Sequence, residues 1–388
     1  MIPARFLIEW AGSGFQALSR ASNVCMAETL YRKYRPKSFS DVTEQEHIKL
    51  TIGQEIKSGK IAHAFLFSGP RGVGKTTLAR LIAKAVNCLK PVDGFEPCNS
   101  CDACKEIESG RSLDIVEIDA ASQTGVDQVR ENIIANAKVA AAIRKYKVFI
   151  IDEVHMLSTA AFNALLKTLE EPPKNVLFIL ATTELHKVLV TIISRCQRFD
   201  FKKIGSKSLV ARLEYTCKNE GFKVSSDVLA AIAKHSQGYL RDALSLLGQI
   251  LSLGQKEISM EEASIIIPSS NFGLVWQMTS AVLGKQLDVA IGLVNKLADD
   301  GNDIFQFANE LVEFLRLLML ARITGNWSEI DDMAAKEAVE TVKKVSADWP
   351  VNDLVRLIDL LLTKKPLIKT TEIPVLPLEL AIVSFCNA

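Results

Sequence analysis

The sequence has almost no net charge and no long hydrophobic run. Its 46 Lys and Arg residues against 45 Asp and Glu residues leave a net charge of +1, so no overall field draws the chain to nucleic acid or to an anionic membrane. Any contact with DNA must therefore come from a local patch. Although 48% of the residues are hydrophobic, no apolar stretch approaches the roughly 18 residues that a membrane-spanning helix needs. We expect a soluble protein without a membrane partner.

A secretory signal, internal repeats and low-complexity segments are also missing from the sequence. The apolar run at residues 6–8 is too short for the core of a secretory signal. We interpret residues 1–25 as an N-terminal extension, untranslated or disordered, with a weak transit segment as the alternative, because Met26 opens a more regular sequence. At about 150 residues per domain, the rest of the chain predicts two or three domains.

Short apolar runs alternate with helical patterns between residues 60 and 201. The runs are rich in β-branched and aromatic residues, as strands are. Apolar residues at helical spacing between the runs mark helices that can cover a sheet. This alternation predicts a parallel β-sheet flanked by helices, an α/β fold. The expected strands are 64–67, 115–118, 148–151, 176–180 and 198–201, and the expected helices are 78–85, 126–137 and 161–169.

Strand signals end after Phe201, and helical periodicity continues to the end of the chain. We expect a small helical domain over 205–267, closed by a break at residues 268–271 (Pro-Ser-Ser-Asn). A third, all-helical domain is expected over 270–388. Apolar stripes at 311–318 and 354–361 usually face a domain's own core, and a role in joining subunits is the alternative. The helices expected in the second domain are 209–217, 227–235 and 241–251.

A glycine-rich loop lies between the first expected strand and the helix after it. Its spacing fits the phosphate-binding P-loop, which requires that strand and that helix. The glycines let the backbone approach a phosphate, and the loop amides and the helix N-terminus supply a positive dipole. Lys75 adds a mobile charge, and the Thr76 hydroxyl is a ligand for Mg²⁺. We expect a nucleotide to be bound by Gly69, Pro70, Arg71, Gly72, Val73, Gly74, Lys75, Thr76 and Thr77.

Two carboxylates follow the third expected strand. Asp152 and Glu153 come directly after residues 148–151, at the carboxyl edge where open parallel sheets bind ligands. Asp152 is expected to hold Mg²⁺, directly or through water. Glu153 is expected to polarise the attacking water, because phosphoryl transfer needs mainly positioning and charge stabilisation from the protein. The P-loop and the acidic pair together predict nucleotide hydrolysis.

Three further segments complete a recognisable signature. They are residues 152–157 (Asp-Glu-Val-His-Met-Leu), 164–173 (Ala-Leu-Leu-Lys-Thr-Leu-Glu-Glu-Pro-Pro) and 194–196 (Ser-Arg-Cys). With the P-loop, they closely resemble the gamma/tau subunit family of bacterial DNA polymerase III, the AAA+ ATPase motor of the sliding-clamp loader. The resemblance covers about residues 30–251, whereas only length and helical character match over 270–388.

The resemblance implies an architecture and several site residues. The implied domains are an AAA+ domain over 26–204, a helical lid over 205–267 and a collar-type oligomerisation domain over 270–388. Thr183 resembles the first sensor, near the terminal phosphate of ATP, with a strand-end cap as the alternative. Arg195 resembles the arginine finger presented to the ATP of a neighbouring subunit, and Arg241 resembles the second sensor on the lid. Ordinary surface arginines are the alternative for both.

The resemblance also points to the adenine site and to one departure from the family. The opening motif at residues 32–36 borders the adenine in the family, so Arg35 is a candidate contact. Glu44 stands before Gln45 where the family usually has glycine, which puts the local turn and the details of adenine recognition in question. Cys196, beside the expected finger, is read as a small packing residue.

Four of the eight cysteines lie within seventeen positions of one another. Cys88 ends the P-loop helix, and Cys98, Cys101 and Cys104 follow in a turn-rich insertion. Four thiolates at this spacing suit a closed, tetrahedral and therefore structural Zn²⁺ site. Disulfides fit less well, because a P-loop ATPase implies a reducing cytoplasm and only two residues separate each of Cys98, Cys101 and Cys104 from the next. The clamp-loader motor subunits carry the same spacing, so we expect a zinc module over 88–104.

The function implied by the resemblance is that of a clamp-loader motor, with ATP and Mg²⁺ at the P-loop. The expected partners are other clamp-loader subunits in a hetero-oligomer, the sliding clamp and primed DNA, with the polymerase core as a further candidate. The sequence ends without the long tail that ties the longer family form to polymerase and helicase. It shows no polymerase chemistry of its own, so nucleotidyltransferase activity would belong to the holoenzyme.

Two other functions remain as alternatives. A different AAA+ engine, such as a DNA-repair or branch-migration ATPase, is disfavoured by the Ser-Arg-Cys segment and the zinc insertion. A non-hydrolysing scaffold is disfavoured by the intact Lys75, Asp152 and Glu153. The sequence does not single out DNA-contacting side chains, because basic residues on helices are usually only solvated. The available candidates are Arg130, Lys138, Arg144 and Lys145.

Overall fold

The computed structural model describes residues 29–122, 125–254, 256–264, 266, 272–331 and 336–387. The expected extension over 1–25, the start at Met26 and the break at 268–271 lie outside the described residues. The chain divides into two compact units, residues 1–267 and 268–388.

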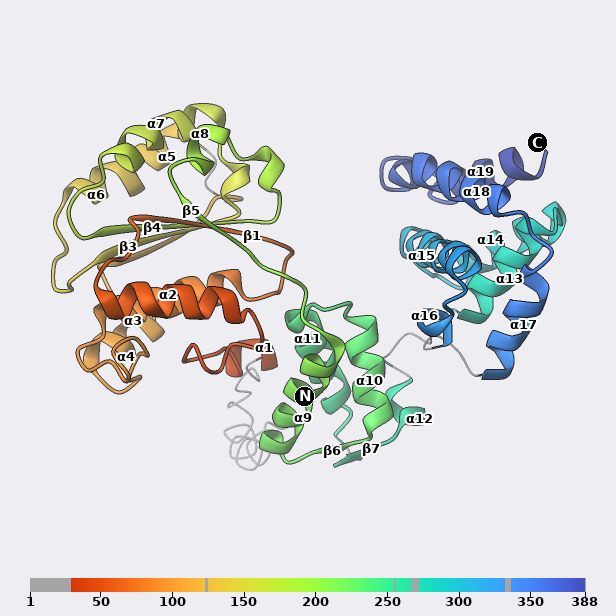
Figure 1. The fold of residues 1–388 in the computed structure, drawn as a ribbon, viewed down its shortest axis with the longest axis horizontal. Helices are drawn as coiled ribbons and strands as arrows, with labels where there is room; N and C mark the ends of the chain where they lie inside the picture. Colours follow the sequence, from red (N-terminus) through yellow and green to blue (C-terminus); the bar gives the residue numbers. More distant parts are fainter. Residues whose placement is uncertain are drawn as a thin grey trace, which may run out of the picture. The chain divides into compact units, whose positions relative to one another are not determined.

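The first unit is built on a five-stranded parallel sheet with the strand order β2-β3-β4-β1-β5 (Figure 1). All five expected strands form, with the fifth shifted by one residue toward the N-terminus. Parallel pairing brings the carboxyl ends of the strands to one edge, where Asp119 pairs with Asp152 and Ser68 with Thr182. The strands are β1 (Ala64–Ser68), β2 (Ile115–Asp119), β3 (Lys147–Asp152), β4 (Val176–Thr182) and β5 (Gln197–Asp200).

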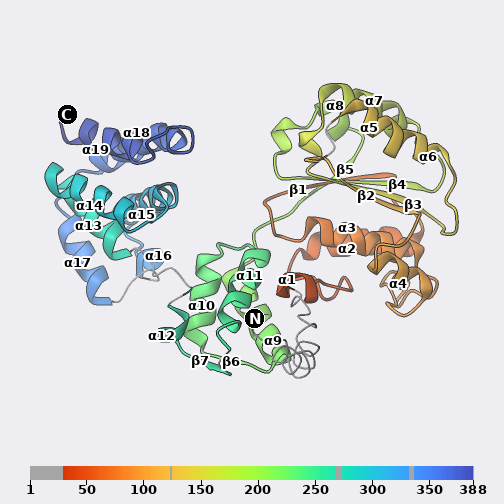
Figure 2. The same ribbon diagram turned by 180° about the vertical axis from the view of Figure 1, so that it is seen from behind.

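Helices cover both faces of this sheet, as the alternating pattern predicts (Figure 1, Figure 2). One face is covered by α2 (Glu46–Ser58), α3 (Lys75–Asn87) and α4 (Asp102–Glu108). The opposite face is covered by α5 (Val126–Val129), the π-helical turn η1 (Arg130–Ala135), α6 (Asn136–Lys138), α7 (Thr159–Glu170) and α8 (Val190–Ile193). Because strand side chains alternate between faces, Phe65 and Phe67 pack on the α2–α3 side, and Leu66 and Phe149 pack on the α7 side.

A smaller helical bundle follows the sheet in the same unit. It consists of α9 (Ser206–Glu220), α10 (Ser226–His235), α11 (Leu240–Leu251) and α12 (Met260–Ala263). The expectation of helices alone is wrong at one place, where β6 (Lys223–Val224) pairs in parallel with β7 (Glu257–Ile258). Two residues are too few for a strand pattern in the sequence. They pair because each segment supplies backbone partners for the other, as in the bond from Lys223 N to Lys256 O at 2.8 Å.

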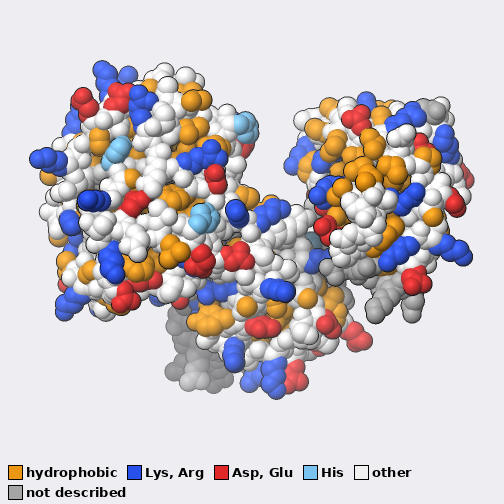
Figure 3. All heavy atoms as spheres, in the orientation of Figure 1, with side chains coloured by type: hydrophobic (Ala, Val, Ile, Leu, Met, Phe, Trp, Pro, Cys, Tyr) orange, Lys and Arg blue, Asp and Glu red, His pale blue; other side chains and the backbone are white. Residues whose placement is uncertain are grey.

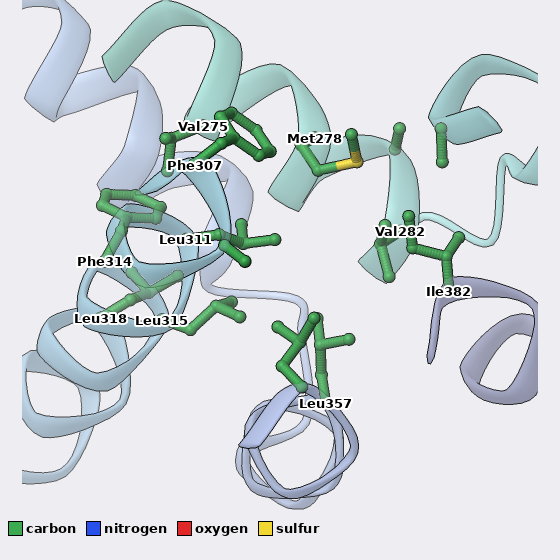
Figure 4. Packing of buried hydrophobic residues seen from close by; sticks show 14 of the residues in the cluster. Val275, Met278, Val282, Phe307, Leu311, Phe314, Leu315, Leu318, Leu357 and Ile382 are labelled. Atoms are coloured by element: carbon green, nitrogen blue, oxygen red, sulfur yellow. The ribbon is translucent and has the colours of Figure 1, made fainter. Parts of the chain in front are cut away.

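The described part of the second unit is entirely helical. Its stripe residues pack inward, as expected, with Leu311, Phe314, Leu315, Leu318 and Leu357 in one buried cluster (Figure 4). No helix in the described part of the chain combines the length and apolar character that crossing a membrane requires. The elements are α13 (Phe272–Leu283), α14 (Leu287–Asp299), α15 (Ile304–Thr324), α16 (Ser328–Asp331), α17 (Lys336–Ser346), α18 (Val351–Lys364), the 3-10 helix η4 (Lys365–Lys369) and α19 (Leu376–Cys386).

Candidate active site

A cavity of about 750 Å³ opens at the carboxyl edge of the sheet, between the glycine-rich loop and the helical bundle. The acidic pair at the end of β3 and Thr183 after β4 line it from the sheet. Further lining residues come from α1 (Leu30–Lys33) and the residues after it, from α11, from Asp119 at the end of β2 and Ala121 after it, and from Ile204 before the bundle. The lining residues that sequence reasoning singled out are Arg35, Arg71, Gly72, Val73, Gly74, Lys75, Thr76, Thr77, Asp152, Glu153, Thr183 and Arg241.

The glycine-rich loop needs its glycines because of their backbone angles and close contacts. Gly69 has φ +144°, and a Cβ there would lie 2.6 Å from the carbonyl oxygen of Phe201. Gly74 has φ +106° directly before α3 begins. Both conformations are left-handed ones that side chains resist. The loop therefore turns tightly enough to aim its amides and the N-terminus of α3 into the cavity.

Lys75 is the first residue of α3 and folds back over the loop. Its Nζ donates to the carbonyl oxygens of Gly69 and Pro70 at 2.7 and 2.8 Å. Burial lowers the pKa of Lys75, and the nearby carboxylates of Glu153 and Asp152 partly oppose that shift. A buried ammonium group satisfied by loop carbonyls is placed to bind phosphate oxygens in their stead.

Thr76 and Asp152 meet directly, although 76 positions separate them in the sequence. The Thr76 hydroxyl donates to Asp152 Oδ2 at 2.6 Å. Thr76 is the second residue of α3, and Asp152 ends β3, so the strand and the helix fix the contact from opposite sides. A hydroxyl and a carboxylate together fit the oxygen ligands that Mg²⁺ prefers. The residues present therefore fit the expected ion.

Glu153 is fixed by groups at the end of β4. Its backbone adopts φ +47°, and its Oε2 accepts hydrogen bonds from Thr183 Oγ1 at 2.9 Å and Thr183 N at 3.3 Å. A third contact comes from His155, whose Nδ1 lies 3.4 Å from the same oxygen. Sequence reasoning assigned no role to His155, although it stands in the quoted segment at residues 152–157.

Arg241, near the start of α11, brings the bundle to the glycine-rich loop. Its backbone N donates to the carbonyl oxygen of Gly72 at 3.4 Å. Its guanidinium carbon lies 4.7 Å from the centroid of the Tyr31 ring, within the range of a cation–π contact. Sequence reasoning missed Tyr31, because only the folded chain brings α1 beside α11.

Glu44 adopts the conformation for which glycine is suited, with φ +58°. Its Oε1 accepts a hydrogen bond from Gly205 N at 3.0 Å, at the start of the bundle. Gln45 Nε2 donates to the carbonyl oxygen of Lys202 at 2.7 Å. Glu44 and Gln45 thus connect this turn to the linker between the sheet and the bundle. Thr43, directly before them, lines the cavity.

Arg195 is not among the residues that line the cavity of its own chain. It follows α8, where its Nη1 donates to the carbonyl oxygen of Thr191 at 2.6 Å and its Nη2 pairs with Glu170 Oε1 at 2.5 Å. The side chain keeps 31% of its surface exposed. Cys196 is partly buried against the core cluster that contains α7 residues, and burial raises the pKa of its thiol to about 12.

The four clustered cysteines converge at the junction of α3 and α4. Their sulfur atoms all lie within 4.8 Å of one another. Backbone amides point at two of them, with Cys98 N 3.3 Å from Cys88 Sγ and Cys101 N 3.4 Å from Cys98 Sγ. Amide donors stabilise thiolates, so the cluster has the ligand set and the surroundings that a tetrahedral Zn²⁺ site needs.

One of the four candidate DNA contacts is not available for that role. The Arg144 side chain is only 8% exposed and forms an ion pair with Glu106 of α4. Sequence reasoning treated it as a helix-surface residue, but it joins the loop before β3 to the cysteine-bearing segment. Arg130 is exposed on η1 and forms a long ion pair with Asp127.

Family profiles match three successive parts of the chain. The profile described as DNA polymerase III, delta subunit, matches residues 44–205, and that of the RCF1/5-like AAA+ ATPase lid domain matches residues 211–248. The profile of DNA polymerase III subunits gamma and tau domain III matches residues 269–388. This last match covers the region where sequence reasoning had only length and helical character.

Curated relatives carry names from the same family. The chain is 42% identical to DNA polymerase III subunit tau of Bacillus subtilis over 361 residues, which cover 93% of this chain and 63% of that protein. It is 40% identical to DNA polymerase III subunit gamma of Buchnera aphidicola over 291 residues, which cover 75% of this chain and 79% of that protein.

The chain spans about half to two thirds of the longer tau relatives, for example 49% of the Escherichia coli protein at 38% identity. Among solved structures, the RuvB Holliday junction branch migration motor of Thermotoga maritima aligns with 18% identity and a TM-score of 0.47, over 70% of this chain and 86% of that chain. A similarity of this size bears on neither fold nor function.

Because the family profiles and the curated relatives agree, the chain belongs to the family of DNA polymerase III gamma and tau subunits.

Proposed function

We propose that this chain is the ATP-hydrolysing motor subunit of a clamp loader, which loads a ring-shaped sliding clamp onto primed DNA during replication. Membership of the gamma and tau family supports the proposal. The observation that carries it is the 2.6 Å contact between Thr76 Oγ1 and Asp152 Oδ2. That contact brings the phosphate-binding loop and the acidic pair to one point, as a single metal-bound triphosphate requires.

The glycine-rich loop, Lys75 and Arg35 bind ATP in this proposal. The loop amides and the N-terminus of α3 face the phosphates, and the Lys75 ammonium leaves the carbonyls of Gly69 and Pro70 for phosphate oxygens. Arg35 borders the base beside Tyr31. Thr76 and Asp152 hold Mg²⁺, which neutralises charge on the phosphates when it is bound.

Glu153 and Thr183 act on the attacking water. The water oxygen forms a bond to the terminal phosphorus, the bond from that phosphorus to the bridging oxygen breaks, and ADP and phosphate result. Glu153 accepts the proton of the water. Thr183, which donates to Glu153 Oε2, keeps the carboxylate at the end of β3 and lies near the terminal phosphate.

Two arginines connect hydrolysis to movement and assembly. Arg241 reaches from the lid bundle over 205–267 to the ATP bound in the same chain, and so draws the lid toward the glycine-rich loop. Arg195 reaches the ATP of a neighbouring subunit, where it stabilises charge on the transferred phosphate. Its position outside its own cavity favours this role over one in its own chain. Activity therefore depends on assembly.

The C-terminal domain over 270–388 joins the chain to other clamp-loader subunits. Figure 3 shows hydrophobic side chains gathered on the visible face of this unit. Such a concentration is typical of surfaces that other subunits cover. In this proposal, the chain also binds the sliding clamp, primed DNA and the polymerase core, and it acts in the cytoplasm. The exposed apolar residues of the unit include Ile323, Val355, Leu362, Leu367, Ile373, Leu376 and Leu380.

Zn²⁺ at the cysteine cluster has a structural role in this proposal. All four ligand positions are taken by Cys88, Cys98, Cys101 and Cys104, which leaves no open position for a substrate. The zinc module over 88–104 then fixes α4 against α3 at the surface of the AAA+ domain over 26–204.

Reconstitution with the cognate clamp and primed DNA tests the proposed function. The assembled loader should hydrolyse ATP faster with clamp and primed DNA than without them, and should place the clamp on DNA. If DNA stimulates ATP hydrolysis equally with and without the clamp, a repair or branch-migration ATPase would be favoured. ATP binding without turnover would favour a scaffold.

A further inference from the structure

His155 lies directly after the acidic pair, in the 3-10 helix η2 (Val154–Met156). Its side chain is only 5% exposed, although imidazole is a polar ring that costs free energy to bury unless its nitrogen atoms have partners. Both nitrogen atoms face polar groups. Nδ1 lies 3.0 Å from Thr182 Oγ1 and 3.4 Å from Glu153 Oε2, and Nε2 lies 3.6 Å from Glu184 Oε1.

Three groups converge on one oxygen of the Glu153 carboxylate. Thr183 contributes its hydroxyl at 2.9 Å and its backbone N at 3.3 Å, and His155 contributes Nδ1 at 3.4 Å. All three contacts fall on Oε2. A carboxylate held through one oxygen keeps a fixed rotation, so the other oxygen, Oε1, can be presented to a water in the cavity.

The imidazole ring is itself fixed by the end of β4. The Thr182 hydroxyl contacts Nδ1 and also accepts a hydrogen bond from Glu184 N at 3.0 Å. A bond from Lys187 lowers the pKa of Glu184, which keeps a negative charge beside Nε2. The ring therefore bridges the segment after β3 and the segment after β4, and a turn of the ring would break contacts on both sides.

We propose that His155 is a positioning residue for hydrolysis, which holds the Glu153 carboxylate in the rotation that accepts a proton from the attacking water. This inference rests on the proposed function and assigns a residue within the same site. His155 touches neither ATP nor water in this role and acts through Glu153. A side chain that only filled space would need no polar atom at either end.

Two substitutions of His155 separate positioning from packing. His155→Leu fills the space and removes both nitrogen atoms, whereas His155→Asn keeps a polar atom close to the place of Nδ1. In the assembled loader, we expect His155→Leu to lower kcat about 10-fold, less than the roughly 10²–10⁴-fold contributed by a general base itself, because His155 only positions that base. We expect His155→Asn to recover most of that loss. The KM for ATP and the equilibrium affinity for ATP should stay within about two-fold of the parent.

Two further variants keep the test decisive if His155→Leu folds poorly. Glu184→Gln changes a half-exposed side chain, so it should fold, and it should lower kcat by a smaller factor of about two to five because it only loosens the ring. His235→Asn, at an exposed position of α10, is the matched control and should leave kcat unchanged. In a Glu153→Gln background, His155→Leu should add little, because residues that act as a unit are not additive.

The outcomes that overturn the inference differ from those that overturn the proposed function. An assembled parent that binds no ATP, or binds it without turnover, contradicts the proposed function itself. A parent that hydrolyses ATP while His155→Leu and Glu184→Gln keep its kcat contradicts only the role of His155. Equal losses in His155→Leu and His155→Asn, with a lowered Tm in both, would identify a purely structural histidine and also overturn the inference.

Discussion

At the scale of single residues, the candidate site consists of charges that the fold holds close together. The Lys75 ammonium is mostly buried, and burial lowers its pKa. Asp152 and Glu153 line the same cavity as Lys75. The Lys75 ammonium donates hydrogen bonds to the loop carbonyls of Gly69 and Pro70. Phosphate oxygens are stronger partners for an ammonium group than neutral carbonyls are.

Replacing Lys75 by alanine should therefore remove a large part of the binding energy for ATP. We expect Lys75→Ala to raise the Kd for ATP at least about 30-fold, corresponding to about 2 kcal/mol for a charge-assisted contact. Isothermal titration calorimetry measures this directly. Lys207→Ala, at an exposed position of α9, is the matched control. Equal affinity in Lys75→Ala and the parent would place the nucleotide elsewhere.

Local sequence was enough to predict the core of the site but not its surroundings. The glycine-rich loop and the acidic pair are each continuous in the chain, and both line one cavity, as expected. Tyr31 and His155 contact neighbours that only the fold supplies, namely Arg241 from α11 and Thr182 from the end of β4. No spacing rule in the sequence relates such pairs.

At the scale of secondary-structure elements, α1 is joined to the lid bundle by a small polar cluster. Glu220, at the end of α9, accepts hydrogen bonds from Tyr34 at 2.6 Å and pairs with Lys33 at 2.7 Å. The bonds from Lys33 and Tyr34 hold the pKa of Glu220 below its ordinary value of 4.5. The segment after α1, which carries Arg35, is thereby attached to the lid.

The lowered pKa of Glu220 predicts a specific pH dependence of stability. A carboxylate with a lower pKa in the folded state stabilises the fold above its unfolded pKa, and this contribution is lost as the pH falls through the folded value. The Tm of Glu220→Gln should therefore lie below that of the parent at pH 7. The difference should shrink as the pH falls below 4.5 and through the lowered pKa of Glu220, because protonation makes the Glu220 side chain neutral, as glutamine is. Thermal scans at pH 7 and pH 3.5 measure it, and a difference that grows on acidification would contradict the assignment.

The cysteine cluster makes a second prediction at this scale, because it joins α3 to α4. We expect purified parent protein to contain one Zn²⁺ per chain and Cys101→Ser to contain much less, with a Tm lowered by about 5 °C or more. Metal analysis and calorimetry give the two values. Cys386→Ser, outside the cluster, should change neither. If zinc-free Cys101→Ser folds and assembles as the parent does, the metal has no structural role, which would contradict the prediction.

Periodicity predicted many of the larger elements, missed α2 (Glu46–Ser58), and failed where elements are short. The five strands and the helices α3, α7, α9, α10 and α11 follow from apolar runs and stripes of at least four residues. The β6–β7 pair is only two residues long in each strand, which is below the length at which alternation can be seen. The strand order β2-β3-β4-β1-β5 depends on which crossovers pack together, and local patterns do not contain that information.

At the scale of the whole molecule, the proposed role of Arg195 would connect catalysis to assembly. The guanidinium is held by Thr191 and Glu170 on the surface of its own chain. An exposed ion pair of this kind contributes little stability, so the pair can give way to a phosphate group of a neighbouring subunit. The family membership, and with it the expectation of a multi-subunit complex, was predictable from the sequence segments that resemble clamp-loader motors. The arrangement of subunits was not.

Substitution of Arg195 should separate ATP binding from hydrolysis. We expect Arg195→Ala to bind ATP with the affinity of the parent, while turnover in the assembled loader falls about 10³-fold, as for arginine fingers supplied in trans. Clamp loading should be lost with it. Arg198→Ala, which removes the exposed ion pair with Asp200, is the matched control. If the assembled Arg195→Ala loader hydrolyses ATP at the parental rate, hydrolysis does not need this arginine from a neighbouring subunit.

The most direct test of the whole account is the effect of Glu153→Gln on the assembled loader with clamp and primed DNA. The measurement is the ratio of ATP bound to ATP hydrolysed, taken on the same preparation. The account predicts ATP binding within about two-fold of the parent and turnover lowered at least about 100-fold, because the carboxylate that accepts the proton is gone. Turnover at the parental rate in Glu153→Gln would contradict it, because hydrolysis would then proceed without the carboxylate at the end of β3.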